Sequence, residues 1–310
     1  QIKTMGVRNA YFPLLIPESL LRTEADHFSG FVPEVFWVTK AGSADVGERL
    51  AARPTSESIA YSSFGKWIKS WRDLPLKLNI WNSVLRAEIT GTKPFIRTSE
   101  FLWQEGHTVH ETSDEAWEET EKILDVYEKF AREHLAIPVI TGEKTENERF
   151  PGADRTLCIE AMVQDRKAIQ AGTSHFLGQN FSKASDISFA GRDGTKQFGW
   201  TTSWGVSTRL VGTLIMAHGD DQGLVLPPQL APIQVVIVPI WKKNRDDEKR
   251  VVMEAVDEMK AALGKDVRVK VDDRDGHSPG WKFNEWELKG VPLRIEIGPR
   301  DVQEGQAVLA

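Results

Sequence analysis

The pattern of apolar and polar positions divides the chain into two parts that differ in the order of their predicted strands and helices. In the first part, strand-like runs follow one another and helical runs occur at irregular intervals; examples of the strands are Leu76–Ile89, Phe95–His107 and Thr156–Val163. Strands that follow one another closely through short turns pair in antiparallel fashion. We therefore predict an α+β fold with an antiparallel sheet for this part.

The strongest helical pattern runs from Thr112 to Leu135. Apolar residues recur on one side at helical spacing, with Glu and Lys between them. Thr112 and Glu115 stand three residues apart at its start, as in a capping box. We expect this helix to pack on the sheet and to carry no chemistry. A further helical run covers Glu18–Phe28.

Two shorter segments bear on the candidate site. Asn9–Pro17 reads as a strand, and Pro13 inside it lacks a ladder donor, which predicts an edge strand or a subunit contact. Glu57–Trp71 reads as a helix, and Thr55 or Ser56 is expected to cap its start.

The order of predicted elements changes at the proline-rich segment Leu224–Pro232, which is therefore the best candidate for a domain boundary. We predict a first domain of residues 1–226, a linker of residues 227–232 and a second domain of residues 233–310. In the second domain, strands predicted near 233–240, 267–273 and 291–298 alternate with helices predicted at 246–263 and 278–289. The βαβαβ order predicts a parallel sheet, and no glycine-rich phosphate motif is present there.

Composition narrows the class of protein. The net charge is −6, so any contact with RNA has to use local basic patches. The single cysteine, Cys158, rules out an internal disulfide framework and a cysteine-based zinc site within the chain. No run suits a membrane span and the first residues do not read as a signal peptide, so we expect a cytoplasmic location and no membrane partner. The chain begins without Met and ends on an apolar run, and we expect a fragment.

The stretch from Arg86 to His107 carries the first candidate chemistry. It reads as two strands joined by a turn at Thr90–Pro94, and its charged residues share a face with Phe101 and Trp103. Guanidinium groups fork onto phosphate and stack on rings, so arginines among aromatics suit a planar anionic ligand such as a nucleotide. The alternative is a half-buried hairpin with internal salt bridges.

A second candidate lies where a strand enters a helix near Gly205–Arg209. A small-residue turn followed by an arginine at a helix start is suited to an anion. The alternative is an ordinary helix cap with a surface arginine. The histidines have no metal-ligand spacing, and each is expected to be a hydrogen-bonded structural residue; they are His107, His110, His175 and His218.

Several blocks in order resemble the motifs of the class II aminoacyl-tRNA synthetases. Residues 86–88 (RAE) followed by PFIRTSEFLWQEGHT resemble motif 2, and SWGVSTRLVGTLIMAHGDDQGLVLPP resembles motif 3, with Arg209 as its arginine. NAYFPLLIP resembles the tail of motif 1, with Pro13 as its proline. RPTSE and AIQAGTSHFLGQNF together resemble prolyl-tRNA synthetases of the archaeal/eukaryotic type. The resemblance covers essentially the whole chain, without the helix that opens motif 1 or the C-terminal end of this family.

The resemblance implies an antiparallel-sheet catalytic core followed by an α/β anticodon-binding domain. It implies a ligase that activates proline with ATP to prolyl-adenylate, releases pyrophosphate, and transfers proline to the 3′-terminal adenosine of proline tRNA. Mg²⁺ on the ATP phosphates and a homodimer formed through the motif 1 region are implied as well.

The same resemblance assigns expected roles to residues of this chain. Arg86 and Arg209 are expected to be catalytic, through the α-phosphate and the γ-phosphate respectively. The expected ATP-binding set is Arg86, Glu88, Arg97, Thr98, Phe101, Gln170, Thr173, Ser207 and Arg209, with Gln170 also a possible contact of Mg²⁺. The expected proline-binding set is Phe31, Thr55, Glu57, Arg86, Trp103, Glu105, His107, His175 and Trp204.

Two other functions stay open from the sequence. One is a synthetase-like protein that binds RNA or a ligand in a regulatory role without catalysis. Such a protein is expected to have lost a phosphate-binding arginine or the Thr/Glu pair, whereas Arg86, Arg209, Thr55 and Glu57 are all present. The other is a class II synthetase for another amino acid, which would lack the combination of RPTSE and GTSH.

Overall fold

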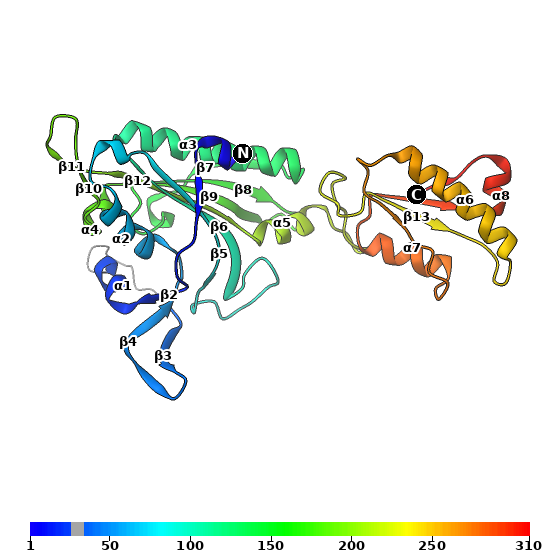
Figure 1. Cartoon of the computed structure of the whole chain (residues 1–310), viewed down its shortest axis with the longest axis horizontal. Helices are drawn as coiled ribbons and strands as arrows, with labels where there is room; N and C mark the ends of the chain where they lie inside the picture. Colours follow the sequence, from blue (N-terminus) through cyan, green and yellow to red (C-terminus); the bar gives the residue numbers. More distant parts are fainter. Residues whose placement is uncertain (26–33) are drawn as a thin grey trace. The chain divides into compact units, whose positions relative to one another are not determined.

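The computed structural model describes residues 1–25 and 34–310, which fall into two compact units (Figure 1). The first unit comprises residues 1–132 and 137–213, and the second comprises residues 133–136 and 214–310. The predicted linker at 227–232 stays a prediction.

A seven-stranded sheet forms the centre of the first unit. Its strands are, in spatial order, β1 (Arg8–Ala10), β5 (Leu76–Leu85), β6 (Glu100–His110), β12 (Trp200–Ser207), β9 (Ala168–Gly178), β8 (Arg155–Met162) and β7 (Val139–Glu143). Every pair is antiparallel except β1 with β5. The predicted α+β class with an antiparallel sheet is confirmed.

Helix α3 (Ser113–Lys129) lies along one face of this sheet (Figure 1) and continues into a π-turn at Phe130–His134. Tyr127 buries its ring there and donates its hydroxyl hydrogen to Gln104 of β6. At the start of α3, Thr112 Oγ1 accepts from the Glu115 main-chain N–H, as predicted. The Glu115 carboxylate accepts from the N–H of Glu111 rather than of Thr112, so the reciprocal bond forms one residue earlier than in a capping box.

The opposite face carries the apolar core and the helices α2 (Glu57–Trp67) and α4 (Asn180–Ala184). Tyr61 and Phe64 of α2 pack with Phe181 of α4 on buried residues of the sheet such as Ile80. This packing holds the start of α2 against the sheet, next to the cavity described below.

Several small elements complete the first unit. Strands β2 (Leu15–Pro17), β4 (Ala44–Ala52) and β3 (Trp37–Ala41) form a separate sheet, and α1 (Glu18–Ala25) follows β2; the short elements are η1 (Ile2–Met5), η2 (Trp71–Asp73), η4 (Glu146–Glu148), β10 (Ser188–Ala190) and β11 (Lys196–Phe198). The end of the helix predicted to Phe28 lies outside the described residues. The single strand predicted over Asn9–Pro17 is wrong. Two strands, β1 and β2, are separated by a short non-strand segment that contains Pro13, and proline cannot donate to a ladder.

The predicted hairpin of the 86–107 stretch is shorter than expected. Strand β5 ends at Leu85 and β6 begins at Glu100, so residues 86–99 form a loop instead of a five-residue turn. Within it, a bridge joins Lys93 to Arg97, and Phe95 between them has a left-handed φ of 60°. The predicted placement of Arg86 on a strand is therefore wrong: the residue stands on the loop side of the strand end.

The second unit contains a four-stranded sheet in the order β14 (Val269–Val271), β13 (Val235–Pro239), β15 (Leu293–Ile297) and β16 (Val308–Leu309). The first three strands are parallel, which confirms the predicted βαβαβ arrangement, and β16 adds an antiparallel edge. Its helices are α6 (Asp246–Leu263), α7 (Pro279–Leu288) and α8 (Pro299–Glu304), and α5 (Arg209–His218) begins in the first unit. In the described part of the chain, no helix combines the length and apolar character needed to cross a membrane.

Candidate active site

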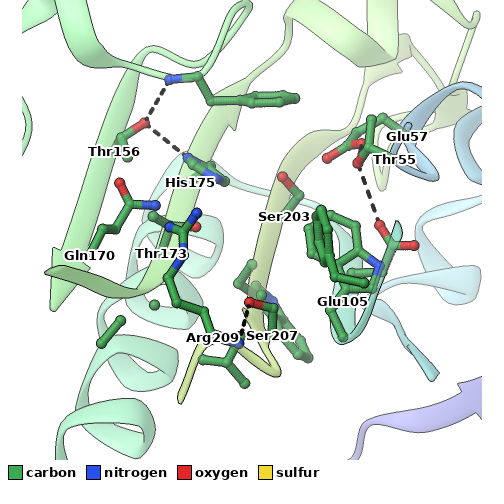
Figure 2. Close-up of a pocket in the computed structure, with 18 of the residues that line it drawn as sticks. Thr55, Glu57, Glu105, Thr156, Gln170, Thr173, His175, Ser203, Ser207 and Arg209 are labelled. Carbon is green, nitrogen blue, oxygen red and sulfur yellow. Dashed lines mark hydrogen bonds between the residues drawn. The ribbon is translucent and has the colours of Figure 1, made fainter. Parts of the chain in front are cut away.

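The floor of the site is a row of polar residues that crosses neighbouring strands of the large sheet. Ser203 of β12 pairs with His107 of β6 on one side and with His175 of β9 on the other. Thr156 of β8 continues the row, because it pairs with His175. Residues that pair directly across strands present their side chains on the same face. These four residues line a cavity of about 230 Å³ (Figure 2).

Gly205 opens the next row of the floor. It pairs with Glu105 on one side and with Thr173 on the other, and all three line the cavity. A Cβ atom at Gly205 would lie 3.0 Å from the carbonyl oxygen of Gln104, tighter than ordinary packing. Because Gly205 has no side chain, space for a ligand remains above the sheet between the carboxylate of Glu105 and the hydroxyl of Thr173.

Trp204 supports this floor from the other side of the sheet. It pairs with Gly106 and Ser174, and Ser174 donates its hydroxyl hydrogen to the Thr120 carbonyl on α3. The indole fills the space directly above Gly106, on the face that α3 covers. Trp204 is among the residues that line the cavity, while its ring packs over Gly106 on the face that α3 covers.

The loop before α2 brings hydroxyl groups and a carboxylate to one end of the cavity. Thr55 Oγ1 donates to the Glu57 carboxylate, and both side chains are almost fully buried. Ser56 occupies the N-cap position of α2 but makes no side-chain cap, because its side chain is turned to Glu105, to which the hydroxyl donates, and its oxygen accepts from Asn82 Nδ2 at 3.3 Å. The predicted capping role of Thr55 or Ser56 is therefore wrong: hydrogen bonds with buried side chains turn both hydroxyl groups away from the free N–H groups at the helix start.

Glu105 is the centre of a buried hydrogen-bond network. Its carboxylate accepts from Ser56 N and Oγ, from Asn82 Nδ2 at 2.7 Å and from His107 Nε2 at 3.1 Å. Trp103 joins the network by donating its indole N–H to Asn82 Oδ1 at 2.6 Å. Burial pushes the pKa of Glu105 upward, but the bonds and charge of His107, with those of Ser56 and Asn82, outweigh it and hold the pKa below its usual value. Glu105 therefore acts as an ionised scaffold that orients its neighbours.

The other end of the cavity is rich in arginine. Arg86 lies over the rings of Phe101 and Trp103, at 5.3 and 5.7 Å, and its Nε donates to the Pro54 carbonyl. Arg209 begins α5, and its Nε donates to the Ile96 carbonyl at 3.0 Å.

No carboxylate pairs with Arg86, Arg97 or Arg209 within residues 1–25 and 34–310. Burial and the charges of Arg86 and Arg97 lower the pKa of Arg209. Guanidinium groups gathered without a counter-ion form a site for an anion with several negative charges.

Most of the predicted residues meet in this one cavity. Those that line it are Thr55, Glu57, Arg86, Phe101, Trp103, Glu105, His107, Gln170, Thr173, His175, Trp204, Ser207 and Arg209. Glu88, Arg97 and Thr98 lie on the loop 86–99 and are not among its lining residues, and Thr98 Oγ1 donates to the Glu100 carbonyl. Phe31 lies outside the described residues.

The sequence reading missed a further group of lining residues. They are Lys144, Glu148, Phe150, Thr156, Ala171, Gly172 and Ser203, whereas the lining residues Gly205 and Val206 belong to the segment predicted as an anion site. Several come from the connection between β7 and β8, which has no apolar periodicity to mark it. Phe150 lies against the His175 ring, with ring centroids 5.0 Å apart, so this connection covers the cavity at His175.

One group in the described part of the chain has the spacing of a metal site. It consists of Glu57, Glu105 and His107, whose candidate ligand atoms lie within 4.8 Å of one another. Glu105 already accepts bonds from four donor atoms, so the group reads as a hydrogen-bonded scaffold.

The cavity thus combines a buried Thr/Glu pair, an arginine-rich anion site and a floor formed by an antiparallel sheet. The class of protein to which this combination belongs follows from the family matches. Residues 36–218 match the family described as tRNA synthetase class II core domain (G, H, P, S and T), and residues 234–310 match the anticodon binding domain. The first match spans more than half of the chain, and the chain belongs to the class II aminoacyl-tRNA synthetases of this group.

Within that class the chain is similar to proline--tRNA ligases. It is 57% identical to the enzyme of Cenarchaeum symbiosum over 311 residues, covering 100% of this chain and 65% of that protein. It is 59% identical to the enzyme of Chloroflexus aurantiacus over 311 residues, covering 100% of this chain and 64% of the relative. The crystal structure of prolyl-tRNA synthetase from Cryptosporidium parvum, complexed with halofuginone and AMPPNP, matches with a TM-score of 0.92 and 50% identity, over 100% of this chain and 63% of that one. The chain thus spans slightly less than two thirds of the length of these proteins.

Proposed function

We propose that the chain is the catalytic core and anticodon-binding part of a proline–tRNA ligase. The observation that carries the proposal is a single cavity with a buried Thr55–Glu57 pair among its lining residues, together with Arg86 and Arg209, which pair with no carboxylate in the described part of the chain. An amino acid with a charged nitrogen fits the first group, and the phosphates of ATP fit the second. The similarity to proline--tRNA ligases supports proline as the amino acid.

The amino-acid end suits a secondary ammonium. Free proline carries a positive nitrogen with two N–H donors, and the Glu57 carboxylate supplies a buried counter-ion beside the Thr55 hydroxyl. Trp103, Phe150 and His175 border the space that the ring would fill. His175 stays neutral, since burial and then the charges of Lys144 and His107 lower its pKa to about 3, so it does not repel the ammonium group.

The arginine end suits ATP. Arg86 lines the same cavity as Glu57 and is proposed to bridge the proline carboxylate and the α-phosphate, while Arg209 holds the γ-phosphate. Phe101 offers an aromatic face for adenine, with Glu88 and Thr98 near the base and Arg97 near the phosphates. Gln170, Thr173 and Ser207 supply neutral polar contacts along the nucleotide. A Mg²⁺ ion bound to the ATP phosphates would be held mainly by phosphate oxygens and water, and the Gln170 amide oxygen is the protein group that would contact it.

The proposed chemistry needs no protein nucleophile. The proline carboxylate oxygen attacks the α-phosphorus, the bond to the β-phosphate oxygen breaks, and pyrophosphate leaves. A ribose hydroxyl of the terminal adenosine of tRNA then attacks the carbonyl carbon, and AMP leaves. The reaction is accelerated by positioning of the substrates and by charge stabilisation, and Arg86 is placed to stabilise the negative charge that develops at the α-phosphate.

The remaining parts of the proposal concern partners. The second unit, with its match to the anticodon binding domain, is proposed to bind the anticodon of proline tRNA. Two copies are proposed to associate around the segment of Pro13, where Tyr11, Leu14 and Leu15 are exposed. A cytoplasmic location stays a prediction.

Proline-dependent exchange of pyrophosphate into ATP tests the function in the full-length protein. Exchange is expected with proline, and not with glycine, histidine, serine or threonine, the other amino acids of this synthetase group. A folded protein that binds ATP without exchange would instead support a non-catalytic role. Exchange with another amino acid in place of proline would support a different ligase.

A further inference from the structure

Thr156 lies under the cavity, between the connection 144–154 and the ring of His175. We propose that Thr156 is a positioning residue that fixes which ring nitrogen of His175 carries the proton. The consequence for substrate binding rests on the proposed function, whereas the proton position itself does not. Figure 2 shows the Thr156 hydroxyl between a main-chain nitrogen and the His175 ring.

The direction of the two hydrogen bonds follows from their partners. The main-chain N–H of Phe150 can only donate, and it lies 3.4 Å from Thr156 Oγ1, which accepts. The hydroxyl hydrogen of Thr156 then needs an acceptor, and His175 Nδ1 lies 3.0 Å away. No other acceptor for this hydrogen occurs among residues 1–25 and 34–310. Thr156 is fully buried, so water does not offer one.

The proton of His175 is therefore on Nε2. With Nδ1 accepting from Thr156, a neutral imidazole keeps its single hydrogen on the other nitrogen. Burial holds the ring in the neutral form, since the pKa of His175 falls to about 3 through desolvation and the charges of Lys144 and His107. His175 lines the cavity and thus offers it one neutral N–H donor.

The same hydroxyl ties His175 to the cover of the cavity. Phe150 donates its N–H to Thr156, and its ring lies against both His175, at 5.0 Å, and Phe181, at 6.2 Å. The Thr156 carbonyl also accepts from the N–H of Lys144 at 2.8 Å. Thr156 thus holds the connection at two points, its start at Lys144 and its middle at Phe150, so the position of Phe150 and the proton on Nε2 are coupled.

An N–H donor at this place recognises an acceptor oxygen on the amino-acid substrate. The available acceptors are the carboxylate of free proline and the carbonyl oxygen of the adenylate. If the proton of His175 were on Nδ1, Nε2 would present a lone pair to these oxygens, and the interaction would be repulsive. We therefore infer that Thr156 sets the affinity for the amino acid and leaves that for ATP unchanged.

The test uses three variants of the full-length protein, read by two methods. Thr156→Val keeps the shape and removes the hydroxyl, Thr156→Ser restores it, and Thr201→Val is the matched control. Thr201 is a buried threonine whose hydroxyl donates to the Gly178 carbonyl. Long-range ¹H–¹⁵N spectra of ¹⁵N-histidine protein at pH 7 report the protonated nitrogen, with His175 assigned from a His175→Asn variant.

The expected spectrum shows Nε2–H at His175 in the parent, in Thr156→Ser and in Thr201→Val, and a mixed or reversed tautomer in Thr156→Val. In exchange assays, Thr156→Val is expected to raise the KM for proline about fivefold, the value of one neutral hydrogen bond, with the KM for ATP unchanged. A proton on Nδ1 in the parent, or a Thr156→Val spectrum like that of the parent, overturns the proposal. Expected spectra without any proline-dependent exchange would reject the proposed function and leave the tautomer assignment standing.

Discussion

The indole of Trp204 occupies the space directly above Gly106, where any side chain on residue 106 would overlap its ring. Gly106 separates Glu105 from His107 on β6, and both neighbours turn their side chains to the opposite, cavity face. The glycine thus allows an aromatic ring to support the strand that carries two residues of the site.

Replacing Gly106 by alanine is expected to damage both stability and the site. The added methyl group has no room, so the indole or β6 must move, and such overpacking costs about 1–3 kcal/mol. Displacement of β6 also moves Glu105, which is expected to raise the KM for proline more than the KM for ATP. Urea unfolding and pyrophosphate exchange measure the two effects.

Gly142→Ala is the matched control for this substitution. Gly142 also lies in a strand of the same sheet, but a Cβ atom there meets nothing within 4 Å. Its stability and exchange rate are expected to stay close to those of the parent. Equal losses in both variants would contradict the packing argument.

Arg209→Ala is expected to lower the exchange rate by roughly 10²–10³-fold, the usual cost of removing one electrostatic contact in a transition state. Arg209→Lys is expected to recover little of this loss, because lysine keeps the charge but loses the planar fork and its bond to the Ile96 carbonyl. Arg192→Ala, which removes an exposed arginine paired with Glu111, is expected to leave exchange unchanged. Parental exchange rates in the Arg209→Lys variant would show that only charge is needed there.

Local patterns predicted the elements well, because they depend on neighbours along the chain. The helix at α3 and the alternation of the second unit follow from periodicity, and the confirmed sheet class follows from successive strands. The clustering of Arg86, Glu57 and Arg209 came from motifs that carry long-range information implicitly.

The rest of the site depends on register, which a single sequence does not contain. Ser203 lies between His107 and His175 because three strands align in one row, and no local feature marks it. The cap predicted at Ser56 is absent for a related reason: the Ser56 side chain is directed to a carboxylate 49 residues away in the chain. The face of Trp204 was likewise decided by pairing with Gly106 rather than by its own neighbours.

Glu105→Gln tests whether the buried network needs a charge. The glutamine side chain accepts at one oxygen only, so its NH₂ group would face donors such as Ser56 or Asn82 and leave a buried donor unsatisfied. We expect a loss of about 2–4 kcal/mol in unfolding free energy and a weaker affinity for proline.

The pH dependence of this loss has a definite sign. The pKa of Glu105 is lowered in the folded protein, so its contribution is present above the ordinary value of 4.5 and is lost as the pH falls through the lowered value. The difference between the parent and Glu105→Gln should therefore shrink in acid. Glu118→Gln, at an exposed residue of α3 paired with Lys122, is expected to leave stability close to that of the parent. A constant difference from pH 7 to pH 3 would argue against an ionised Glu105.

His110 and His175 should make the fold sensitive to acid in a second way. Burial lowers the pKa of each to about 3, with help from Lys77 and Lys122 at His110, whereas an unfolded histidine has its ordinary pKa of 6.5. Between these values the unfolded chain binds protons that the folded chain does not. Stability is therefore full above pH 6.5 and falls as the pH drops towards 3, by up to about 1.4 kcal/mol per pH unit for each histidine.

The His110→Gln variant separates this effect from other causes of destabilisation at low pH. Glutamine can still bond to the Thr108 hydroxyl, the partner of His110 Nε2 at 2.8 Å, but it does not titrate. The slope of unfolding free energy against pH between 6 and 4 is expected to decrease by about 1.4 kcal/mol per pH unit in this variant. NMR titration of the folded parent gives an independent check, because neither imidazole should shift above about pH 4. An imidazole resonance of His110 that titrates near pH 6.5 would show that water reaches the ring and that burial does not hold it neutral.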